Sequence, residues 1–148
     1  MTDSNRAADP FSWAPISQLI GLEVQPPLEN APGTAEVFLN VDQRMHNPMG
    51  VVHGGIISLL ADAVMGIAFG RVLSEKYGFA TIELKINYMR PVTVSRLHAK
   101  AELITRGLRI GFLECRIVDH RRKLIATASC TCTVTSLGPQ SSLSGQGK

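Results

Sequence analysis

A long apolar segment near the middle of the chain limits the folds that this sequence can adopt. Residues 54–73 are almost all apolar, and their length and their Ala, Leu and Met content favour a helix over a strand. The segment approaches the length of a membrane span, but Asp62 lies near its middle, where a carboxylate would be costly in a bilayer. We therefore expect a helix buried inside a protein that makes no membrane contact. Because this helix is apolar nearly all round, other elements must cover most of its surface.

Segments with the alternation typical of β-strands flank this helix. Residues 34–41 alternate before it, residues 81–88, 97–103 and 124–135 alternate after it, and residues 110–118 form a less regular apolar run. The short turns between the later segments favour an antiparallel meander. A flat sheet cannot enclose a helix, so we expect the sheet to curl around it and a second subunit to cover the remainder. The predicted class is α+β, with a curled antiparallel sheet wrapped around one long central helix.

In two of these predicted strands, the side chains on the two faces differ in a way that indicates how the strand packs. In residues 81–88 an apolar set alternates with a polar set: Ile82, Leu84, Ile86 and Tyr88 against Thr81, Glu83, Lys85 and Asn87. In residues 124–135 the apolar face is mostly Ala and Cys, whose small side chains let a helix lie close to the sheet. Cys130 and Cys132 fall on this face. No set of four ligands at zinc spacing accompanies them, so we interpret them as buried apolar residues.

Polar segments at both ends bound the predicted domain. We expect residues 1–9 and 136–148 to be disordered and residues 10–135 to form one domain, beginning with a helix over residues 11–20 that Gly21 ends. The N-terminus lacks the basic and apolar regions of a signal peptide. The three cysteines are an odd number in a chain of 148 residues, which does not need disulfides. These features predict a cytoplasmic protein.

The charge distribution argues against nucleic-acid binding. The net charge is only +3, and the Lys and Arg residues do not form the dense basic stripe with interleaved aromatic residues that is typical of such proteins. We interpret the one basic cluster, Arg121-Arg122-Lys123, as a solvated turn. Contact with the phosphates of a small anionic ligand is the alternative.

Gly54 and Gly55 begin the predicted helix and suggest an anion-stabilising site there. Residues 51–55 contain no Ser, Thr, Asp or Asn cap, and a helix start leaves N–H groups without partners and a partial positive charge. Glycine also lets a ligand approach the backbone. Such a site can bind a carbonyl oxygen that becomes negative during nucleophilic attack. The alternative is that glycine is an acceptable cap and water satisfies the donors.

Asp62 is the second candidate residue. A buried carboxylate without partners is costly, so such residues are often functional, although a structural Asp bonded to backbone or a hydroxyl is the alternative. Eight positions separate Asp62 from Gly54, which is about 12 Å along a helix axis. An attacking carboxylate must lie within about 3–3.5 Å of the carbonyl carbon. If both residues act on one substrate, they must come from different subunits, which predicts an active site at a dimer interface.

His53 and Asn47 flank the glycine pair, but neither belongs to a nucleophile motif or to a metal-binding histidine pair. A histidine before Gly-Gly is most often a structural hydrogen-bonding residue. We assign no role to His46, which we place in a loop, or to His98 and His120, which we expect to be exposed. No metal site and no separate cofactor are predicted.

The segment from Asn47 to Asp62, with His53-Gly54-Gly55 between them, resembles the hotdog-fold acyl-CoA thioesterases of the phenylacetate-degradation type. Residues 81–91 are also similar to the central strand of that family, and the likeness spans roughly residues 33–135. The resemblance implies the hotdog fold, in which a curled antiparallel sheet wraps one long helix. It also implies hydrolysis of an acyl-CoA, with an aromatic acyl group as one option, by a homodimer or homotetramer.

The same resemblance implies roles for individual residues. The N–H of Gly54 would polarise the thioester carbonyl, and Asp62 would act as nucleophile or as general base on water. Asn47 and His53 would shape the loop and place the thioester or the water, and Thr81 would assist near the acid. The other substrate contacts expected are Gly55, Tyr88, Arg90, Arg106 and Arg109. Arginine suits the recognition of phosphates.

Two other functions fit the same segment. One is a non-catalytic module that binds acyl-CoA as a sensor, although sensors usually carry a second domain for which we see no room. The other is a hydratase or dehydratase acting on the acyl chain, which typically pairs an Asp with a His near one carbon. The separation of His53 and Asp62 along one helix weakens such a pair within one chain.

Overall fold

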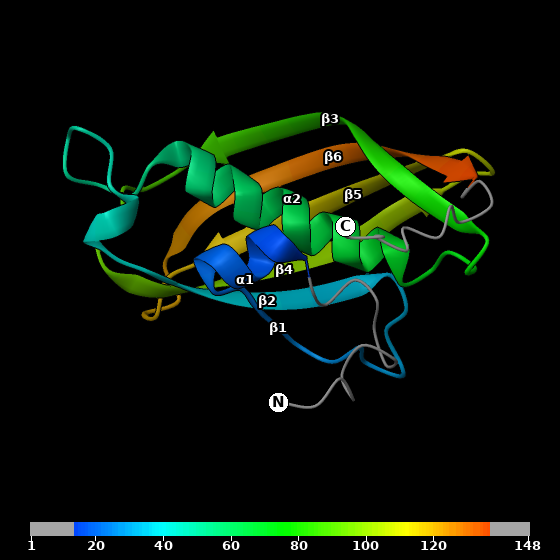
Figure 1. The fold of residues 1–148 in the computed structure, drawn as a ribbon, viewed down its shortest axis with the longest axis horizontal. Coiled ribbons are helices and arrows are strands. Elements are labelled where there is room, and N and C mark those ends of the chain that lie inside the picture. The colour runs from blue at the N-terminus through cyan, green and yellow to red at the C-terminus, as the bar shows by residue number, and fades with distance from the viewer. Residues whose placement is uncertain (1–13, 137–148) are drawn as a thin grey trace, which may run out of the picture.

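Helix α2 (Gly54–Gly70) lies across a six-stranded antiparallel sheet in the computed structural model, which describes residues 14–136 (Figure 1). The elements follow in the order α1 (Pro15–Ile20), β1 (Glu23–Val24), β2 (Thr34–Val41), η2 (Gln43–Met45), α2, β3 (Tyr77–Tyr88), β4 (Ser95–Arg106), β5 (Ile110–Val118) and β6 (Leu124–Ser136). The strand order is β1-β2-β4-β5-β6-β3, so β1 and β3 are the edges of the sheet among the described residues. The expected α+β class, with a curled antiparallel sheet and one long helix, is confirmed.

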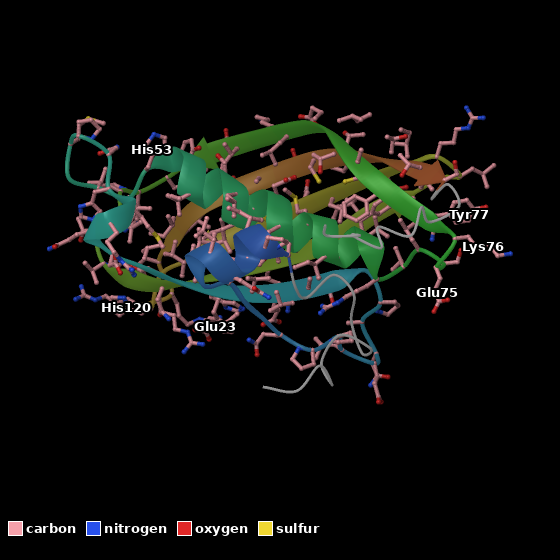
Figure 2. All side chains as sticks on the ribbon, in the orientation of Figure 1. Glu23, His53, Glu75, Lys76, Tyr77 and His120 are labelled. Carbon is pink, nitrogen blue, oxygen red and sulfur yellow. The ribbon has the colours of Figure 1, made fainter. Side chains whose placement is uncertain are left out.

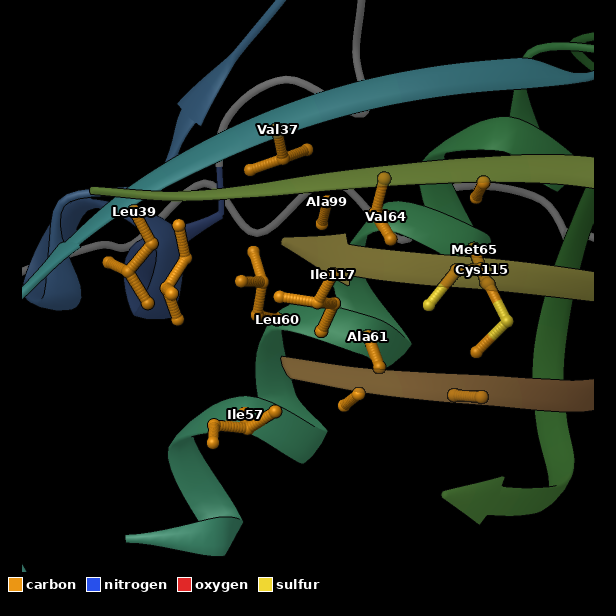
Figure 3. Packing of buried hydrophobic residues seen from close by; sticks show 14 of the residues in the cluster. Val37, Leu39, Ile57, Leu60, Ala61, Val64, Met65, Ala99, Cys115 and Ile117 are labelled. Atoms are coloured by element: carbon orange, nitrogen blue, oxygen red, sulfur yellow. The ribbon is translucent and has the colours of Figure 1, made fainter. Parts of the chain in front are cut away.

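The face of α2 that meets the sheet supplies much of the core. In Figure 3 the buried side chains of α2 lie beside the buried side chains on the inward faces of β2, β4 and β5. In the first half of α2 the buried residues repeat at helical spacing on one side, at Ile57, Leu60, Ala61 and Val64, whereas every residue from 64 to 70 is buried. The opposing positions of β6 are Ala126, Ala128, Cys130 and Cys132, all buried as the sequence predicted. Burial of this apolar surface is the main force that holds the helix on the sheet.

Helix α2 begins at Gly54 and α1 ends at Ile20, as predicted, but the end of α2 and the start of α1 differ from the prediction. Helix α2 ends three residues before Leu73, because the N–H groups of Val72 and Leu73 turn back to the carbonyls of Phe69 and Gly70. Within residues 14–136 no helix has the length and apolar character needed to cross a membrane. Helix α1 begins at Pro15, and Ala14 before it is extended, as the ring of a following proline requires.

Expectations for the chain ends are only partly covered by the structure. Gly21 ends α1 with a φ of +78°, as predicted. Ser136, which was expected to begin a disordered tail, is instead the last residue of β6, where it pairs with Tyr77. The expectations for residues 1–13 and 137–148 lie outside the described residues.

Strand β2 follows the predicted alternation, and its one irregular residue has a structural explanation. Phe38 lies on the outer face of the sheet, where its ring stacks on His98 of β4 with centroids 4.4 Å apart. The Arg96 guanidinium lies over the same ring, and Glu36 accepts a hydrogen bond from His98 at 2.8 Å. His98, which was expected to be exposed, is half-buried, with the Phe38 ring stacked on it and Glu36 bonded to it.

Strand β3 departs from the simple alternation that its sequence predicted. A bulge between Thr81 and Glu83 shifts the register against β6, so that Ile82 is left without a partner residue. Before the bulge, Thr81 pairs with Cys132, a buried residue on the helix side of β6. After it, Leu84 pairs with Cys130 on the same side. Thr81 therefore faces α2 rather than sharing the outer face with Glu83.

Candidate active site

His53 caps the start of α2 and leaves only one of the two glycine amides unbonded. The His53 Nδ1 atom accepts a hydrogen bond from the N–H of Gly55 at 2.8 Å. Among the described residues, no acceptor meets the N–H of Gly54. The helix start has no Ser, Thr, Asp or Asn cap, but an imidazole nitrogen can accept as those oxygens do, so His53 is the cap and is the structural hydrogen-bonding residue that was expected. Figure 2 shows His53 at this end of the helix.

The loop before the helix is organised by Asn47. Its Oδ1 atom accepts hydrogen bonds from the N–H groups of Met49 at 3.0 Å and Val51 at 3.4 Å. Its own N–H donates to the carbonyl of Val51, and Gly50 takes a φ of +78° that completes the turn. Asn47 thus fixes the path of the backbone into the helix, which agrees with its expected role in shaping the loop.

Tyr88, the last residue of β3, packs against Gly54. The Tyr88 hydroxyl donates to the Gly54 carbonyl at 2.9 Å and is 2.7 Å from the Ser58 hydroxyl. A Cβ atom at position 54 would lie 3.0 Å from the Tyr88 hydroxyl oxygen. The close approach of this ring therefore favours glycine at the start of the helix, because a larger residue would push the Tyr88 side chain by a few tenths of an ångström.

A cavity of about 310 Å³ opens beside the free amide of Gly54. It is lined by Asn47, Val51, Val52, Gly54, Ile57, Tyr88, Met89, Arg90 and Pro91. The structure thus brings four of the predicted site residues to one cavity. The first residue of α2 and Arg90 line the same cavity, and both a helix N-terminus and an arginine favour an anionic or polarised ligand.

Asp62 lies on the open side of α2, not in the core. Its side chain is exposed, so the expectation of a buried carboxylate was wrong within one chain. The neighbouring residue Ala61 takes the position against the sheet, and Asp62 is turned by one residue around the helix toward β3. There its Oδ1 atom accepts a hydrogen bond of 2.9 Å from the Thr81 hydroxyl. Only the bulge in β3 makes this contact available, because it turns Thr81 toward the helix.

Asp62 and Thr81 line a second cavity, which differs from that of Gly54. Its volume is about 230 Å³, and its lining comes from α1, α2 and β3: Ala14, Ile16, Ser17, Leu59, Asp62, Ala63, Gly66, Ile67, Phe79 and Thr81. No residue lines both cavities. Within one chain, the carboxylate and the free amide therefore do not converge, as the spacing along the helix predicted.

Arg106 and Arg109 lie far from the start of α2. They line a third cavity of about 1000 Å³ together with Tyr77, and Arg106 donates to the carbonyl of Val72 beyond the end of α2. Figure 2 shows Tyr77 at the opposite end of the molecule from His53. One chain therefore does not bring these two arginines to the Gly54 cavity.

Two residues at the site were missed in the sequence. Ser58 bonds Tyr88 near the helix start, and its place one helical turn after Gly54 was the signal that could have identified it. Ser17 lines the Asp62 cavity, and nothing in the sequence of the short α1 segment pointed to that.

Comparisons with known proteins identify a family and several relatives. The sequence profile of the thioesterase superfamily matches residues 49–126, which include Gly54 and Asp62. A 1,4-dihydroxy-2-naphthoyl-CoA hydrolase from Listeria monocytogenes is 27% identical over 119 residues, covering 80% of this chain and 94% of that protein.

Two solved structures share the fold. A thioesterase from Haemophilus influenzae superposes with a TM-score of 0.80 at 24% identity, covering 95% of this chain and 96% of that one. The PaaI protein from the phenylacetic acid degradation operon of Escherichia coli superposes with a TM-score of 0.74 at 22% identity, covering 84% and 86%. The chain adopts the hotdog fold and belongs to the thioesterase superfamily.

Proposed function

We propose that the protein hydrolyses acyl-CoA thioesters at a site that two subunits share. One observation carries this proposal: the free N–H of Gly54 and the Thr81-bonded carboxylate of Asp62 line separate cavities of one chain. Each cavity holds half of what thioester hydrolysis needs, namely a donor for the carbonyl oxygen and a carboxylate for the attack. A second subunit that faces the first in the opposite direction would complete both halves.

The free edge of β3 supports such a pairing. Among the described residues this edge has no partner strand, although β3 is twelve residues long. Ile82 on it is 58% exposed. A long unpaired edge with an exposed apolar residue favours pairing with another strand. Two β3 strands that run antiparallel about a two-fold axis would extend one sheet into the other.

One register of this pairing would assemble the site. Tyr88 touches Gly54, and Thr81 touches Asp62. If Tyr88 of one subunit lies opposite the partner subunit's Thr81, the partner subunit's Asp62 approaches the Gly54 amide. The two-fold axis then produces a second, identical site. We propose this register, which uses both pairs of contacts.

The chemistry follows from the two groups. The carbonyl oxygen of the thioester accepts from the Gly54 N–H, whose helix terminus stabilises the negative charge that develops there. Asp62 then either adds to the carbonyl carbon and forms an anhydride that water cleaves, or removes a proton from the attacking water. In both routes the C–S bond breaks and the CoA sulfur leaves as the thiolate, which takes up a proton. Thr81 holds the carboxylate in position throughout.

Three arginines would bind the CoA portion of the substrate. Because CoA belongs to the substrate, the proposed reaction needs no separate cofactor. Arg90 lines the Gly54 cavity and can pair with a phosphate, whereas Arg106 and Arg109 would contribute only from a different subunit or to a distant part of the ligand. The Listeria relative acts, by its name, on the CoA thioester of an aromatic acid. That similarity supports an aromatic acyl-CoA as the first substrate class to test.

The direct test is the release of free thiol from aromatic and aliphatic acyl-CoAs by the purified protein. We expect hydrolysis in the wild type and a loss of at least about 100-fold in Asp62→Asn, with an unchanged oligomer and circular dichroism spectrum. Near wild-type turnover by Asp62→Asn would remove this residue from the mechanism. Tight acyl-CoA binding without any thiol release would instead indicate a binding module.

A further inference from the structure

The turn between β5 and β6 carries the basic cluster Arg121-Arg122-Lys123, which the mechanism above does not use. All three side chains are exposed, and among residues 14–136 none of them forms an ion pair with an acid. Neighbouring cations without acidic partners repel one another, and an anion that binds among them relieves this repulsion. The turn is therefore suited to a small anion.

Backbone hydrogen bonds, rather than the basic side chains, hold this turn in shape. The Asp119 Oδ1 atom accepts from the N–H groups of Arg121 at 2.9 Å and Lys123 at 2.8 Å. The Arg122 N–H donates to the Asp119 carbonyl, and Arg122 takes a φ of +62°. The Asp119 carboxylate offsets part of the positive charge, but its Oδ1 atom is committed to these amides. The basic side chains can thus be shortened without opening the turn.

His120 adds a hydrogen-bonding group beside the basic side chains. Its Nδ1 atom lies 2.9 Å from the Ser95 hydroxyl oxygen, which also accepts from the His120 N–H at 3.3 Å. This contact occupies one ring nitrogen, and no residue in the range 14–136 meets the other, Nε2. A protonated Nε2 atom can donate to a phosphate oxygen. The sequence had suggested no role for His120, because only the fold brings Ser95 to its ring.

A cavity of about 310 Å³, here named the turn cavity, connects this turn with the start of α2. Its lining residues are Val51, Pro91, Val92, Thr93, Val94, Ser95, Asp119, His120, Arg121 and Lys123. Val51 and Pro91 also line the Gly54 cavity, so the two cavities adjoin. Figure 2 shows His120 toward the same end of the molecule as His53. A ligand whose carbonyl lies at Gly54 can therefore extend past the shared residues to the basic turn.

We propose that the turn cavity binds the phosphate monoester on the ribose of CoA, through Arg121, Lys123 and His120. The proposal rests on the proposed function, because it assigns another part of the same substrate. Arg90 lines the Gly54 cavity itself and is thus placed for the diphosphate, which lies nearer to the thioester. The turn lies one cavity further from Gly54, and the ribose phosphate is the charged group one step further along the substrate.

A phosphate monoester matches the turn in charge and in hydrogen bonding. It carries about two negative charges near pH 7 and three strong acceptor oxygens. The Arg121 guanidinium, the Lys123 ammonium and the His120 ring can each donate to one of these oxygens. These residues do not touch the reacting atoms. They would instead favour substrates that carry the ribose phosphate over those that lack it.

The test compares CoA with 3′-dephospho-CoA, which lacks only that phosphate. Benzoyl thioesters of both are given to the wild type, Arg121→Ala, Lys123→Ala and Arg121→Lys. We expect the wild type to prefer benzoyl-CoA in kcat/KM, mainly through a lower KM. Arg121→Ala and Lys123→Ala should each lower that preference about fivefold, and Arg121→Lys, which keeps the charge, should retain most of it.

Arg116→Ala is the matched control, because it removes an exposed positive charge from the outer face of β5 and not from the turn cavity. It should keep the wild-type preference. The preference itself should shrink as salt is added, since the contacts are exposed and ions screen them. If Arg121→Ala and Lys123→Ala slow both thioesters by the same factor, the turn does not recognise the ribose phosphate.

A binding measurement separates failure of this proposal from failure of the hydrolase function. CoA and 3′-dephospho-CoA contain no thioester, and their affinities for the same variants are measured by calorimetry. If the preference for CoA depends on Arg121 and Lys123 but the wild type releases no thiol from any acyl-CoA, the phosphate site stands and the hydrolase function fails. If the wild type binds CoA and 3′-dephospho-CoA equally well, the phosphate site is wrong, even where acyl-CoA is hydrolysed.

Discussion

The Tyr88 hydroxyl lies 2.9 Å from the Gly54 carbonyl and would lie 3.0 Å from any Cβ atom placed on that residue. The last residue of β3 thus helps to hold the helix start in position and favours glycine as its first residue. Because the Gly54 amide is the one free donor of the glycine pair, the same contact determines where a carbonyl oxygen can be bound.

Gly54→Ala should therefore lower turnover without unfolding the protein. The new methyl group would lie 3.0 Å from the Tyr88 hydroxyl oxygen, so the Tyr88 ring or the helix start must shift by a few tenths of an ångström. A displacement of about 1 Å at a reacting group can cost about 100-fold in rate, so a shift of this size should cost about tenfold. We expect such a loss in kcat/KM for acyl-CoA hydrolysis. Gly107→Ala is the matched control, since its added Cβ would meet nothing closer than 3.7 Å and its φ is ordinary. Equal activity of the two variants would contradict this role of Gly54.

Thr81→Val should reduce kcat more than it changes KM. The variant keeps the shape of the side chain but removes the hydroxyl that donates to Asp62 at 2.9 Å, so the carboxylate is no longer held for attack. A loss of about tenfold is expected, with most of the activity retained in Thr81→Ser. Thr133→Val, on the opposite face of the neighbouring strand β6, provides the comparison. A loss in Thr133→Val as large as in Thr81→Val would indicate general damage to the sheet.

Subunit mixing should reveal whether the site is shared. Asp62→Asn chains are expected to be nearly inactive and Gly54→Ala chains to keep about a tenth of wild-type activity, but a mixed dimer has one site with both native groups. Refolding equal amounts together should give about half mixed dimers and hence about a quarter of wild-type activity. If the mixture, with mixed dimers verified by native mass spectrometry, is no more active than its components, the site lies within one subunit.

The edge of β3 should be the surface through which two chains associate. Ile82→Arg places a charge at the bulge of this edge, where Ile82 is 58% exposed, and should shift the protein toward monomers in sedimentation velocity. Activity should fall with the dimer fraction. Leu108→Arg is the control for a charge added away from this edge, because Leu108 is 96% exposed but lies in the turn after β4. Dissociation by Leu108→Arg alone would place the interface elsewhere.

Stability should fall at alkaline pH because of a buried thiol. Burial raises the pKa of Cys115 from 9.0 to about 12. Below pH 9 the thiol is protonated in both states, so it adds no pH dependence. Between pH 9 and 12 the unfolded chain loses this proton and the folded chain keeps it, so the free energy of unfolding falls by up to about 1.4 kcal/mol per pH unit.

Cys115→Ala isolates this contribution from other groups that titrate in the same range. Urea unfolding at pH 8 to 11 should show a shallower decline in the variant than in the wild type. Alkylation at pH 8 should also leave the three cysteines of the folded protein unmodified, since all three are buried. Parallel pH profiles of the two proteins would show that Cys115 does not cause the loss.

Part of the site was predictable from the sequence because it depends on local spacing. Asn47, His53 and Gly54 lie within eight positions, and each acts on the same loop or helix start. The distance of Asp62 from Gly54 is likewise a property of one helix, so their separation could be calculated before any fold was known. The cap by His53 was missed because histidine is not among the usual capping residues.

Contacts between distant segments were not predictable in the same way. Strict alternation predicted that Thr81 and Glu83 share one face of β3. The unpaired Ile82, which turns Thr81 toward Asp62, arises from the pairing of β3 with β6, about fifty residues along the chain. Asp62 is exposed because the sheet packs against a different face of α2. Ser17 lines the Asp62 cavity only because α1 lies near α2 and β3.

The sequence by itself determined the α+β class, the central apolar helix and the residues that stand at its start, because periodicity and helix geometry act over a few residues. Only the tertiary structure decided that Gly54 keeps a free amide, that Asp62 bonds Thr81, and that the two line separate cavities. These outcomes depend on strand register and on which side chains reach the same space. Both are set by packing between segments far apart in the chain, which no local pattern records.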